Sequence, residues 1–464
     1  MRLVLWIVFT VTLCAAELEQ KGVRRTVKAS VEVAGVSLRE FHSWTLSFDP
    51  GASIDTVAFE ATMPEHGHGL STQPTIQALE NGSFLVKGVR FHMAGNWVLR
   101  VRLHDRNGWD SVSIPFRVEY ASVVLKSLWI GSRKGPRADP SNRFADLPAA
   151  AALGKQLFAD KRLSGDGTVS CATCHLAQAA FADNKRFSLP GLRRNTQGLL
   201  GIADASWFFW DGRRDSLWSQ ALAPIESPVE MKSNRKAAVD LLRNHYSESY
   251  RKLAGPLDGD VDRTFTNLGK FIAAYQRTLS PGASRFDKYV EGSAALTPDE
   301  LAGLQIFLKP ESQCLNCHNG PLFTNHAFHN IGTATLDGEN PDFGRAMGVQ
   351  ALAFDAFNCR SVFSDAAGTC PSQDHALSGD HDGALTGAFK TPSLRNVALT
   401  APYLHDGSKA TLEDVIEHYR HPPAKGTELK PLQITDAEAR QLVAFLKTLT
   451  SVPDAVKAPG RPNK

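Results

Sequence analysis

The sequence has little net charge, few cysteines and, after its first residues, no long apolar run. Its 51 Lys and Arg residues nearly balance 48 Asp and Glu residues, so a net charge of +3 gives no basic surface for nucleic acid. Seven cysteines are too few for a disulfide scaffold of 464 residues. With 42% hydrophobic and 21% charged residues, the composition also excludes a disordered or collagen-like chain. The length predicts a multidomain protein of roughly two to four domains.

Residues 1–16 have the pattern of a secretory signal peptide. The apolar run Leu3–Leu13 is shorter than the roughly 20 residues of a membrane-spanning helix, and small residues suited to signal peptidase follow it up to Ala16. Lipidation of Cys14 is the less favoured alternative, because bulky Leu13 stands where a small residue is expected. We therefore expect an exported, periplasmic protein in a compartment that permits disulfides.

Removing the signal peptide leaves six cysteines, and four of them belong to two copies of one motif. The copies are Cys171-Ala-Thr-Cys174-His175 and Cys314-Leu-Asn-Cys317-His318. In this motif two thiols form thioethers with a c-type haem and the histidine ligates its iron. Chance predicts about 0.003 copies at these residue frequencies, and a Cys₄ zinc site would leave both histidines unexplained. We expect two covalent c-type haems.

Cys359 and Cys370 lie outside the two motifs. They are 11 residues apart in a stretch rich in Gly, Asp and Ser, where a loop can bring two Cα atoms within bridging distance. Two free thiols are the less favoured alternative after export. The sequence thus predicts a disulfide between them.

Residues 22–122 have the pattern of an all-β sandwich. Runs near Val27, Ser83 and Trp97 alternate apolar and polar residues, and breaks rich in Gly and Asn separate them. A link rich in Lys, Arg, Pro and Gly follows at 123–143. The fold class we expect is this sandwich followed by mainly α cytochrome c-type domains.

The rest of the chain has the pattern of helices and loops, and it repeats internally. Asp211 and Leu217 recur as Asp406 and Leu412, at a constant offset of 195 residues. Two haem domains in tandem are the simplest account of this repeat. The expected ranges are 144–290 for the first domain, 291–452 for the second and 453–464 for a tail.

The second haem is expected to have a ligand opposite its motif histidine. Thr411 and Asp414 form a capping box that starts a helix, and Tyr419 falls on the apolar face of that helix. His418 is displaced from this face by about 100°. We expect Tyr419 to be the second axial ligand, with an ordinary core tyrosine as the alternative.

The first haem is expected to be open. At the offset of 195, Tyr419 corresponds to Pro224, which cannot ligate iron. No histidine lies between His175 and His245 either. We therefore expect a five-coordinate first haem that a small oxidant can reach.

These motifs resemble the bacterial dihaem cytochrome c peroxidase and MauG family over about residues 145–450. Besides the haem motifs, the resembling stretches include Leu163-Ser-Gly-Asp-Gly, Phe209-Trp-Asp-Gly-Arg, Ser227-Pro-Val-Glu-Met and Phe389-Lys-Thr-Pro-Ser-Leu-Arg. The resemblance implies that the first haem is the peroxide site. It implies that Glu230 assists O–O cleavage as a general acid–base, and that Gln220 and Pro224 line the pocket.

The resemblance also assigns residues between the haem domains. Trp210 matches a tryptophan that carries electrons between the haems, with a core aromatic as the alternative. Asn195, Thr400 and Pro402 match the ligands of a Ca²⁺ ion, whose preference for oxygen ligands suits them.

Two departures separate the chain from ordinary members. Those usually carry a distal histidine on the first haem and a methionine on the second. Methionine raises a haem potential, whereas the tyrosinate expected of Tyr419 stabilises ferric and higher states. MauG-like members share the tyrosine and oxidise residues of a partner protein. We therefore expect an exported enzyme that reacts with hydrogen peroxide and oxidises a protein substrate.

Two other functions are weighed. One is a conventional cytochrome c peroxidase that removes peroxide with electrons from a small cytochrome c or a cupredoxin. The other is a non-enzymatic electron-transfer or copper-handling protein, against which the open first haem argues. The sequence leaves the donor, the protein substrate and the oligomeric state open, a homodimer included.

Part of the predicted sandwich resembles small exported YtkA-like domains. Its Met and His residues would suit copper, and they are Met63, His66, His68 and Met93. An ordinary turn rich in Gly and His is the alternative, as is a domain that docks a partner.

Overall fold

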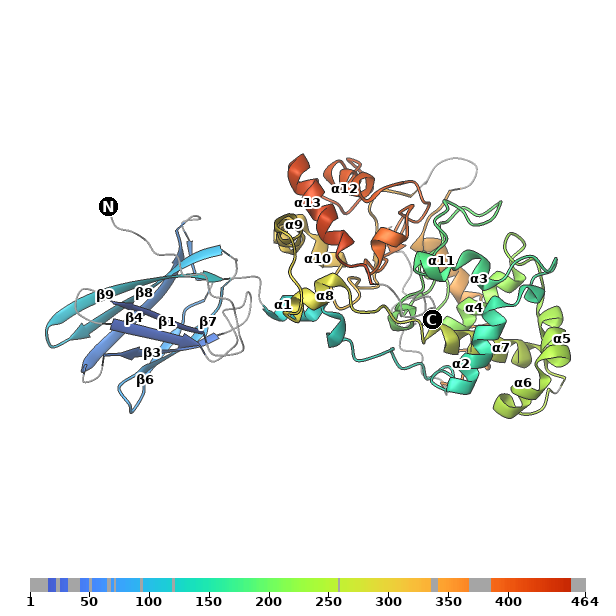
Figure 1. The fold of residues 1–464 in the computed structure, drawn as a ribbon, viewed down its shortest axis with the longest axis horizontal. Helices are drawn as coiled ribbons and strands as arrows, with labels where there is room; N and C mark the ends of the chain where they lie inside the picture. The colour runs from blue at the N-terminus through green and yellow to red at the C-terminus, as the bar shows by residue number, and fades with distance from the viewer. Residues whose placement is uncertain are drawn as a thin grey trace, which may run out of the picture. The chain divides into compact units, whose positions relative to one another are not determined.

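The structure is a computed structural model, and it divides the chain into two compact units, Met1–Ser127 and Leu128–Lys464 (Figure 1). It describes residues 16–21, 26–31, 42–49, 52–64, 68–70, 72–91, 95–118, 122–257, 259–334, 341–366 and 385–451. Within this part of the chain no helix combines the length and the apolarity that crossing a bilayer requires.

The first unit consists of two antiparallel sheets, with strand orders β1-β2-β3-β7-β6 and β5-β4-β8-β9. The strands are β1 (Ala16–Lys21), β2 (Thr26–Val31), β3 (His42–Phe48), β4 (Ile54–Met63), β5 (His68–Gly69), β6 (Thr75–Ala78), β7 (Phe84–Val89), β8 (Gly95–Asp105) and β9 (Gly108–Val118). One core lies between the sheets, where Trp44 of β3 meets Phe116 of β9 edge-on at 5.7 Å. The all-β fold predicted for the N-terminal part of the chain is confirmed, and its first strand begins at Ala16.

The second unit is mainly helical. Its helices are α1 (Ser122–Leu128, which begins in the first unit), α2 (Pro148–Ala159), α3 (Cys171–Cys174), α4 (Leu217–Glu226), α5 (Arg235–His245), α6 (Ser247–Ala254), α7 (Val261–Gln276), α8 (Arg285–Val290), α9 (Pro298–Leu308), α10 (Cys314–Cys317), α11 (Arg345–Ala353), α12 (Leu412–Arg420) and α13 (Asp436–Lys447). Short 3₁₀ turns are η1 (Ile130–Ser132), η2 (Lys161–Leu163), η3 (Ala177–Ala179), η4 (Ile202–Asp204), η5 (Pro310–Ser312) and η6 (Val397–Leu399). A two-stranded ladder joins β10 (Phe328–His329) to β11 (Phe389–Lys390).

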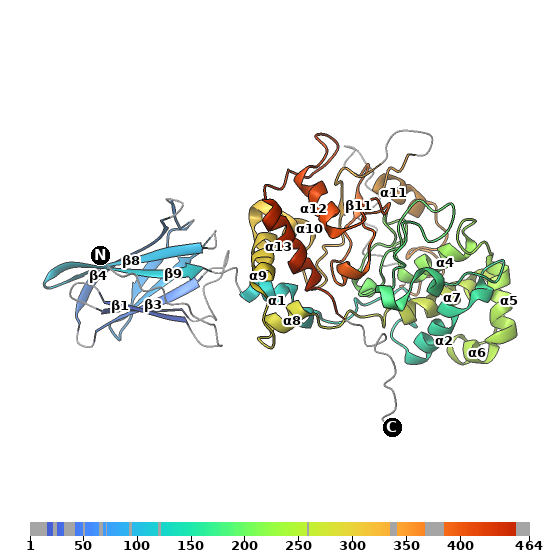
Figure 2. The same cartoon turned by 45° about the horizontal axis from the view of Figure 1, so that its top comes forward.

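Each half of this unit contains a pair of helices in close contact at a glycine. Helix α2 packs against α7, and α9 packs against α13, as both views show (Figures 1 and 2). A Cβ on Gly154 would lie 1.8 Å from the Phe271 carbonyl oxygen, and one on Gly303 would lie 1.9 Å from that of Gln441. Only glycine permits these backbones to approach so closely. The repeat seen in the sequence is therefore also a repeat of helix packing.

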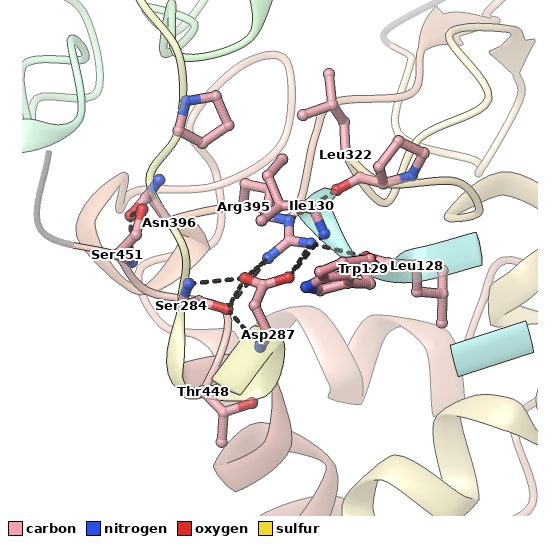
Figure 3. Close-up of polar contacts among 12 residues, drawn as sticks. Leu128, Trp129, Ile130, Ser284, Asp287, Leu322, Arg395, Asn396, Thr448 and Ser451 are labelled. Atoms are coloured by element: carbon pink, nitrogen blue, oxygen red, sulfur yellow. Dashed lines mark hydrogen bonds and ion pairs between the residues drawn. The ribbon is translucent and has the colours of Figure 1, made fainter. Parts of the chain in front are cut away.

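A buried ion pair joins three distant segments of the second unit (Figure 3). Arg395 reaches both carboxylate oxygens of Asp287 on α8, at 2.5 and 2.9 Å, and neither side chain is exposed. Arg395 also donates to the Leu128 carbonyl, and Asp287 accepts from the Ile130 amide. The predicted link at 123–143 thus contains ordered structure, because its backbone is anchored on this pair.

Helix α8 packs with the second half of the unit, although the predicted domain boundary at residue 290 assigns it to the first half. Its Phe286 contacts Phe323 and Phe445 edge-on, at 5.4 and 5.8 Å. Its amide nitrogen also donates to the Thr448 carbonyl. The domain boundary predicted at residue 290 therefore separates α8 from the half of the unit with which it packs.

Candidate active site

Both motif histidines are held in the same way. His318 follows α10 and its Nδ1 donates to the Phe323 carbonyl oxygen at 2.9 Å, while His175 follows α3 and its Nδ1 donates to that of Phe181 at 2.7 Å. The carbonyls accept, so each Nδ1 carries the ring proton and each Nε2 is left without one, ready to bind iron. Burial lowers the pKa of both rings, that of His318 to about 4, which keeps them neutral.

The two accepting residues share an unusual backbone conformation. Phe181 and Phe323 have φ of 60° and 53°, in the left-handed region that large side chains seldom adopt. This conformation presents their carbonyls to the histidines. Strain of this kind persists where the surrounding structure fixes it, which is common at functional sites.

Each motif lines a cavity, and that of the second motif is the larger, with a volume of about 400 Å³. Cys314, Cys317 and His318 line this cavity, and so does Tyr419. The volume is in the range of about 300–1,000 Å³ that is usual for a bound organic molecule. Two thiols, a neutral imidazole with a free Nε2 and a phenol are also the donor set that a covalent haem requires. The residues therefore fit a haem c.

Helix α12 presents Tyr419 to this cavity. The helix begins at Leu412 as predicted, and the Thr411 and Asp414 side chains exchange hydrogen bonds with each other's backbone amides. His418 does not line the cavity, because its Nε2 contacts the Ile331 carbonyl oxygen at 2.7 Å. Burial raises the pKa of the Tyr419 phenol. A bound cation would have the opposite effect and would favour the phenolate.

The first motif lines a second, smaller pocket. Its wall includes Cys171, Cys174 and His175 from the motif, and Gln220 and Pro224 from α4. The volume of about 50 Å³ is too small for a haem, so the lining side chains must separate to admit one. The donor set nevertheless fits a haem c, because both motif thiols are free. In addition, Gln220 Oε1 is buried and has no hydrogen-bond partner among the described residues.

Pro224 occupies the position in the first pocket that Tyr419 occupies in the second. Helix α4 begins at Leu217 and α12 at Leu412, so the offset of 195 holds in the structure as well. Both residues line the wall of a motif cavity. Proline offers no donor to iron, whereas tyrosine does. The sequence predicts this difference between the two sites.

Glu230 also lines the first pocket, with Met231 beside it. The loop that carries them is fixed by the Gly165 amide, which donates to the Met231 carbonyl at 2.8 Å, and by the Glu230 amide, which donates to Ser227. Sequence reasoning missed Met231. The available signal was its position at the end of the Ser227-Pro-Val-Glu-Met stretch, which resembles the family.

Trp210 is buried and lines the larger cavity only. Its indole nitrogen donates to the Asn195 carbonyl at 2.8 Å, and its own carbonyl accepts from the Lys390 amide at 2.8 Å. Arg194 stands beside it, with ion pairs to Asp211 at 2.6 Å and to Asp342 at 2.7 Å. Burial alone would raise the pKa of Asp211, but Arg213 and Arg194 hold it below the usual value. The tryptophan is thus rigidly held beside the second site.

The three predicted Ca²⁺ ligands, Asn195, Thr400 and Pro402, line this same cavity. Asn195 Nδ2 donates to the Lys185 carbonyl at 2.7 Å, which leaves its amide oxygen as the available donor to a cation. Among the described residues no three His, Cys, Asp or Glu side chains form a metal cluster. A Ca²⁺ ion here would rest on amide and backbone oxygens, and its binding stays a prediction.

Two further site predictions fall partly outside the described residues. Met63 is 2% exposed in the core of the sandwich, whereas His66, Met93 and the side chain of His68 are not described. Copper binding therefore stays a prediction. Cys359 is in a disulfide bond, but Cys370 is not described, so their pairing stays a prediction as well.

Comparisons with known proteins point to one family. A sequence profile described as di-haem cytochrome c peroxidase matches residues 148–295. The methylamine utilization protein MauG of Methylorubrum extorquens is 34% identical over 338 residues, which are 70% of this chain and 84% of that protein. Cytochrome-c peroxidase IdrP1 of Denitromonas iodatirespirans is 34% identical over 336 residues, which are 68% and 87% of the two chains. A crystal structure of a MauG-like protein associated with microbial copper homeostasis has a TM-score of 0.54 at 28% identity, covering 68% of this chain and 93% of its own.

Proposed function

Because this chain belongs to the dihaem cytochrome c peroxidase and MauG family, and is thus a peroxide-dependent dihaem oxidoreductase, we propose that it reduces hydrogen peroxide at the Cys171–His175 site and oxidises a partner protein. Peroxide takes up two electrons and two protons and leaves as two water molecules. The partner supplies the electrons. The chain would act in the periplasm, after cleavage of the predicted signal peptide.

One observation carries the proposal: Pro224 and Tyr419 occupy equivalent positions in the two cavities. The haem irons would supply the redox chemistry. Pro224 leaves the far side of the first site free for peroxide, whereas the Tyr419 oxygen would close the second. A phenolate ligand favours the oxidised states of iron, so the second site would hold an oxidising equivalent rather than accept electrons from a small cytochrome.

The other pocket residues act on protons and on position. The Glu230 carboxylate would take a proton from one peroxide oxygen and return it to the other as the O–O bond breaks. Gln220 would use its free buried oxygen to hold the substrate. Trp210, fixed through Asn195 and Lys390, would pass electrons from the second site toward the first.

The test is to mix the fully oxidised protein with one equivalent of peroxide and record stopped-flow spectra, without and then with reduced cytochrome c. A long-lived oxidised spectrum that cytochrome c removes slowly is the expected result. Rapid multiple turnover of cytochrome c would instead identify a conventional peroxidase that detoxifies peroxide. Tight cyanide binding by one haem only would exclude a non-enzymatic electron carrier.

A copper role for the sandwich is a second proposal. A MauG-like structural relative is described as associated with microbial copper homeostasis, and Met63, His66, His68 and Met93 have the ligand types that copper prefers. Titration of the protein with Cu(I) and Cu(II), before and after a double change of His66 and His68 to Ala, tests it. If the double variant binds as many copper ions per protein as the wild type, His66 and His68 are not copper ligands.

A further inference from the structure

Lys390 is a buried cation on the wall of the larger cavity, and no described residue pairs with its ammonium group. The residue is 5% exposed and lies on β11. Its backbone amide is bound to Trp210, but its side chain makes no hydrogen bond or ion pair within the described part of the chain. Burial lowers its pKa to about 8. A lysine is rarely buried in this way without a partner, so the site is built to receive an anion.

His326 provides a second donor close to it. The ladder between β10 and β11 places Lys390 opposite Phe328, and the Thr391 amide donates to the Ala327 carbonyl at 2.8 Å. His326 therefore lies diagonally across from Lys390, and it lines the same cavity. Its Nδ1 is buried and has no partner among the described residues. Burial lowers the pKa of this ring to about 4, so it is a neutral imidazole with one N–H to donate.

The cavity wall itself offers no carboxylate for these donors. The acidic side chain among its described lining residues is Glu428. That carboxylate is already taken, because it contacts His329 Nδ1 at 2.9 Å and accepts from the Asn330 amide at 2.6 Å. The missing anion must therefore come from the molecule that fills the cavity.

We propose that Lys390 and His326 bind the propionate carboxylates of the haem attached at Cys314 and Cys317. A haem carries two such carboxylates, and a pair of buried donors on one wall matches them. The pairing removes the cost of an isolated buried charge on both sides. It also joins the haem edge to Trp210, because the backbone amide of Lys390 is bound to the carbonyl of that tryptophan. The inference requires only family membership, not the open first site or the tyrosine ligand.

The expected effect is on the redox potential of the second haem. A nearby cation stabilises the reduced iron, which has one positive charge fewer, so Lys390→Met should lower that potential. We expect the reduced form to be disfavoured about tenfold, which is about 59 mV for one electron. The measurement is a spectroelectrochemical titration of the whole protein, with resonance Raman spectra of the propionate bending modes. Lys390→Arg should restore most of both signals.

Lys252→Met is the control, because Lys252 is an exposed lysine on α6 that lines neither of the two cavities. It should leave the potential and the propionate bands unchanged. Unchanged values in Lys390→Met, at a confirmed stoichiometry of two haems, would overturn the proposal. Should Lys390→Met fail to retain the second haem, His326→Leu decides instead: propionate bands identical to the wild type in that variant would overturn the proposal.

Discussion

The motif histidines show how a few atoms determine what each site can do. Nδ1 of His175 and of His318 is bound to a backbone carbonyl, so Nε2 is the only ring nitrogen available to iron. A hydrogen bond of this kind also makes the imidazole more basic and fixes the orientation of its ring. The two sites are therefore equivalent on this side, and their difference must come from the opposite side.

Tyr419 is where that difference can be tested. Replacing a tyrosinate ligand by a thioether removes an anion from the iron, so Tyr419→Met should raise the potential of the second haem. Axial ligands tune haem potentials over about 0.8 V, and we expect a rise of at least about 0.1 V. A redox titration of each haem by its optical bands measures the shift.

Tyr403→Phe is the control for that change. Tyr403 lines the same cavity, but its hydroxyl donates to the Val397 carbonyl at 3.1 Å. Its loss should leave both potentials where they are. A second haem whose potential is the same in Tyr419→Met as in the wild type would show that the tyrosine is a core residue.

Glu230 gives a prediction about rate rather than potential. Glu230→Gln keeps the shape of the side chain and removes its ability to take up a proton. The reaction with peroxide should slow by about 10²–10⁴-fold, the usual contribution of a general acid–base, while cyanide binding stays intact. Stopped-flow rates measure both. Glu248→Gln, on the exposed face of α6, should match the wild type, and an equal loss in both variants would remove Glu230 from the mechanism.

At the scale of elements, the glycines at the helix contacts set the packing of each half. Gly154→Ala would place a methyl group on the Phe271 carbonyl of α7. We expect the variant to lose about 1–3 kcal/mol of unfolding free energy, the usual cost of overpacking, although alanine is the better helix former. Chemical denaturation followed by circular dichroism measures the loss. Gly259→Ala meets nothing within 4 Å and should be nearly neutral; equal stability of the two variants would contradict the packing argument.

The elements also show which parts of the site the sequence could predict. The start of α12, the equivalence of Pro224 with Tyr419 and the haem motifs depend on local spacing or on a constant offset, and both are visible in one dimension. Lys390 and His326 became neighbours only through the pairing of β10 with β11, which are far apart in the chain. The assignment of α8 to the second half likewise depends on tertiary contacts of Phe286. Long-range pairing leaves no periodic signal in a single sequence.

At the scale of the whole second unit, the Asp287–Arg395 pair connects the end of α1 and the start of η1 with α8 and with the loop before η6 (Figure 3). Removing one partner leaves a buried charge without compensation, which costs about 3–5 kcal/mol. Asp287→Asn should therefore lower the stability of this unit by about that amount. Thermal unfolding monitored at the haem bands and in the far ultraviolet measures the loss. Asp240→Asn, which breaks a partly exposed pair with Lys236, should change stability by about 0.5 kcal/mol or less.

The Asp287–Arg395 pair should also make the stability of this unit depend on pH. Burial raises the pKa of Asp287, but the hydrogen bonds and charge of Arg395 outweigh burial and hold it below its ordinary value. A carboxyl whose pKa is lower in the folded state contributes stability above its unfolded pKa of about 3.9, and that contribution disappears as the pH falls through the folded value. The stability gap between the wild type and Asp287→Asn should thus be constant from neutral pH to about pH 5 and narrow below about pH 4. A gap that stays constant down to pH 2 would mean that the aspartate acts through packing alone and that its charge does not hold these segments together.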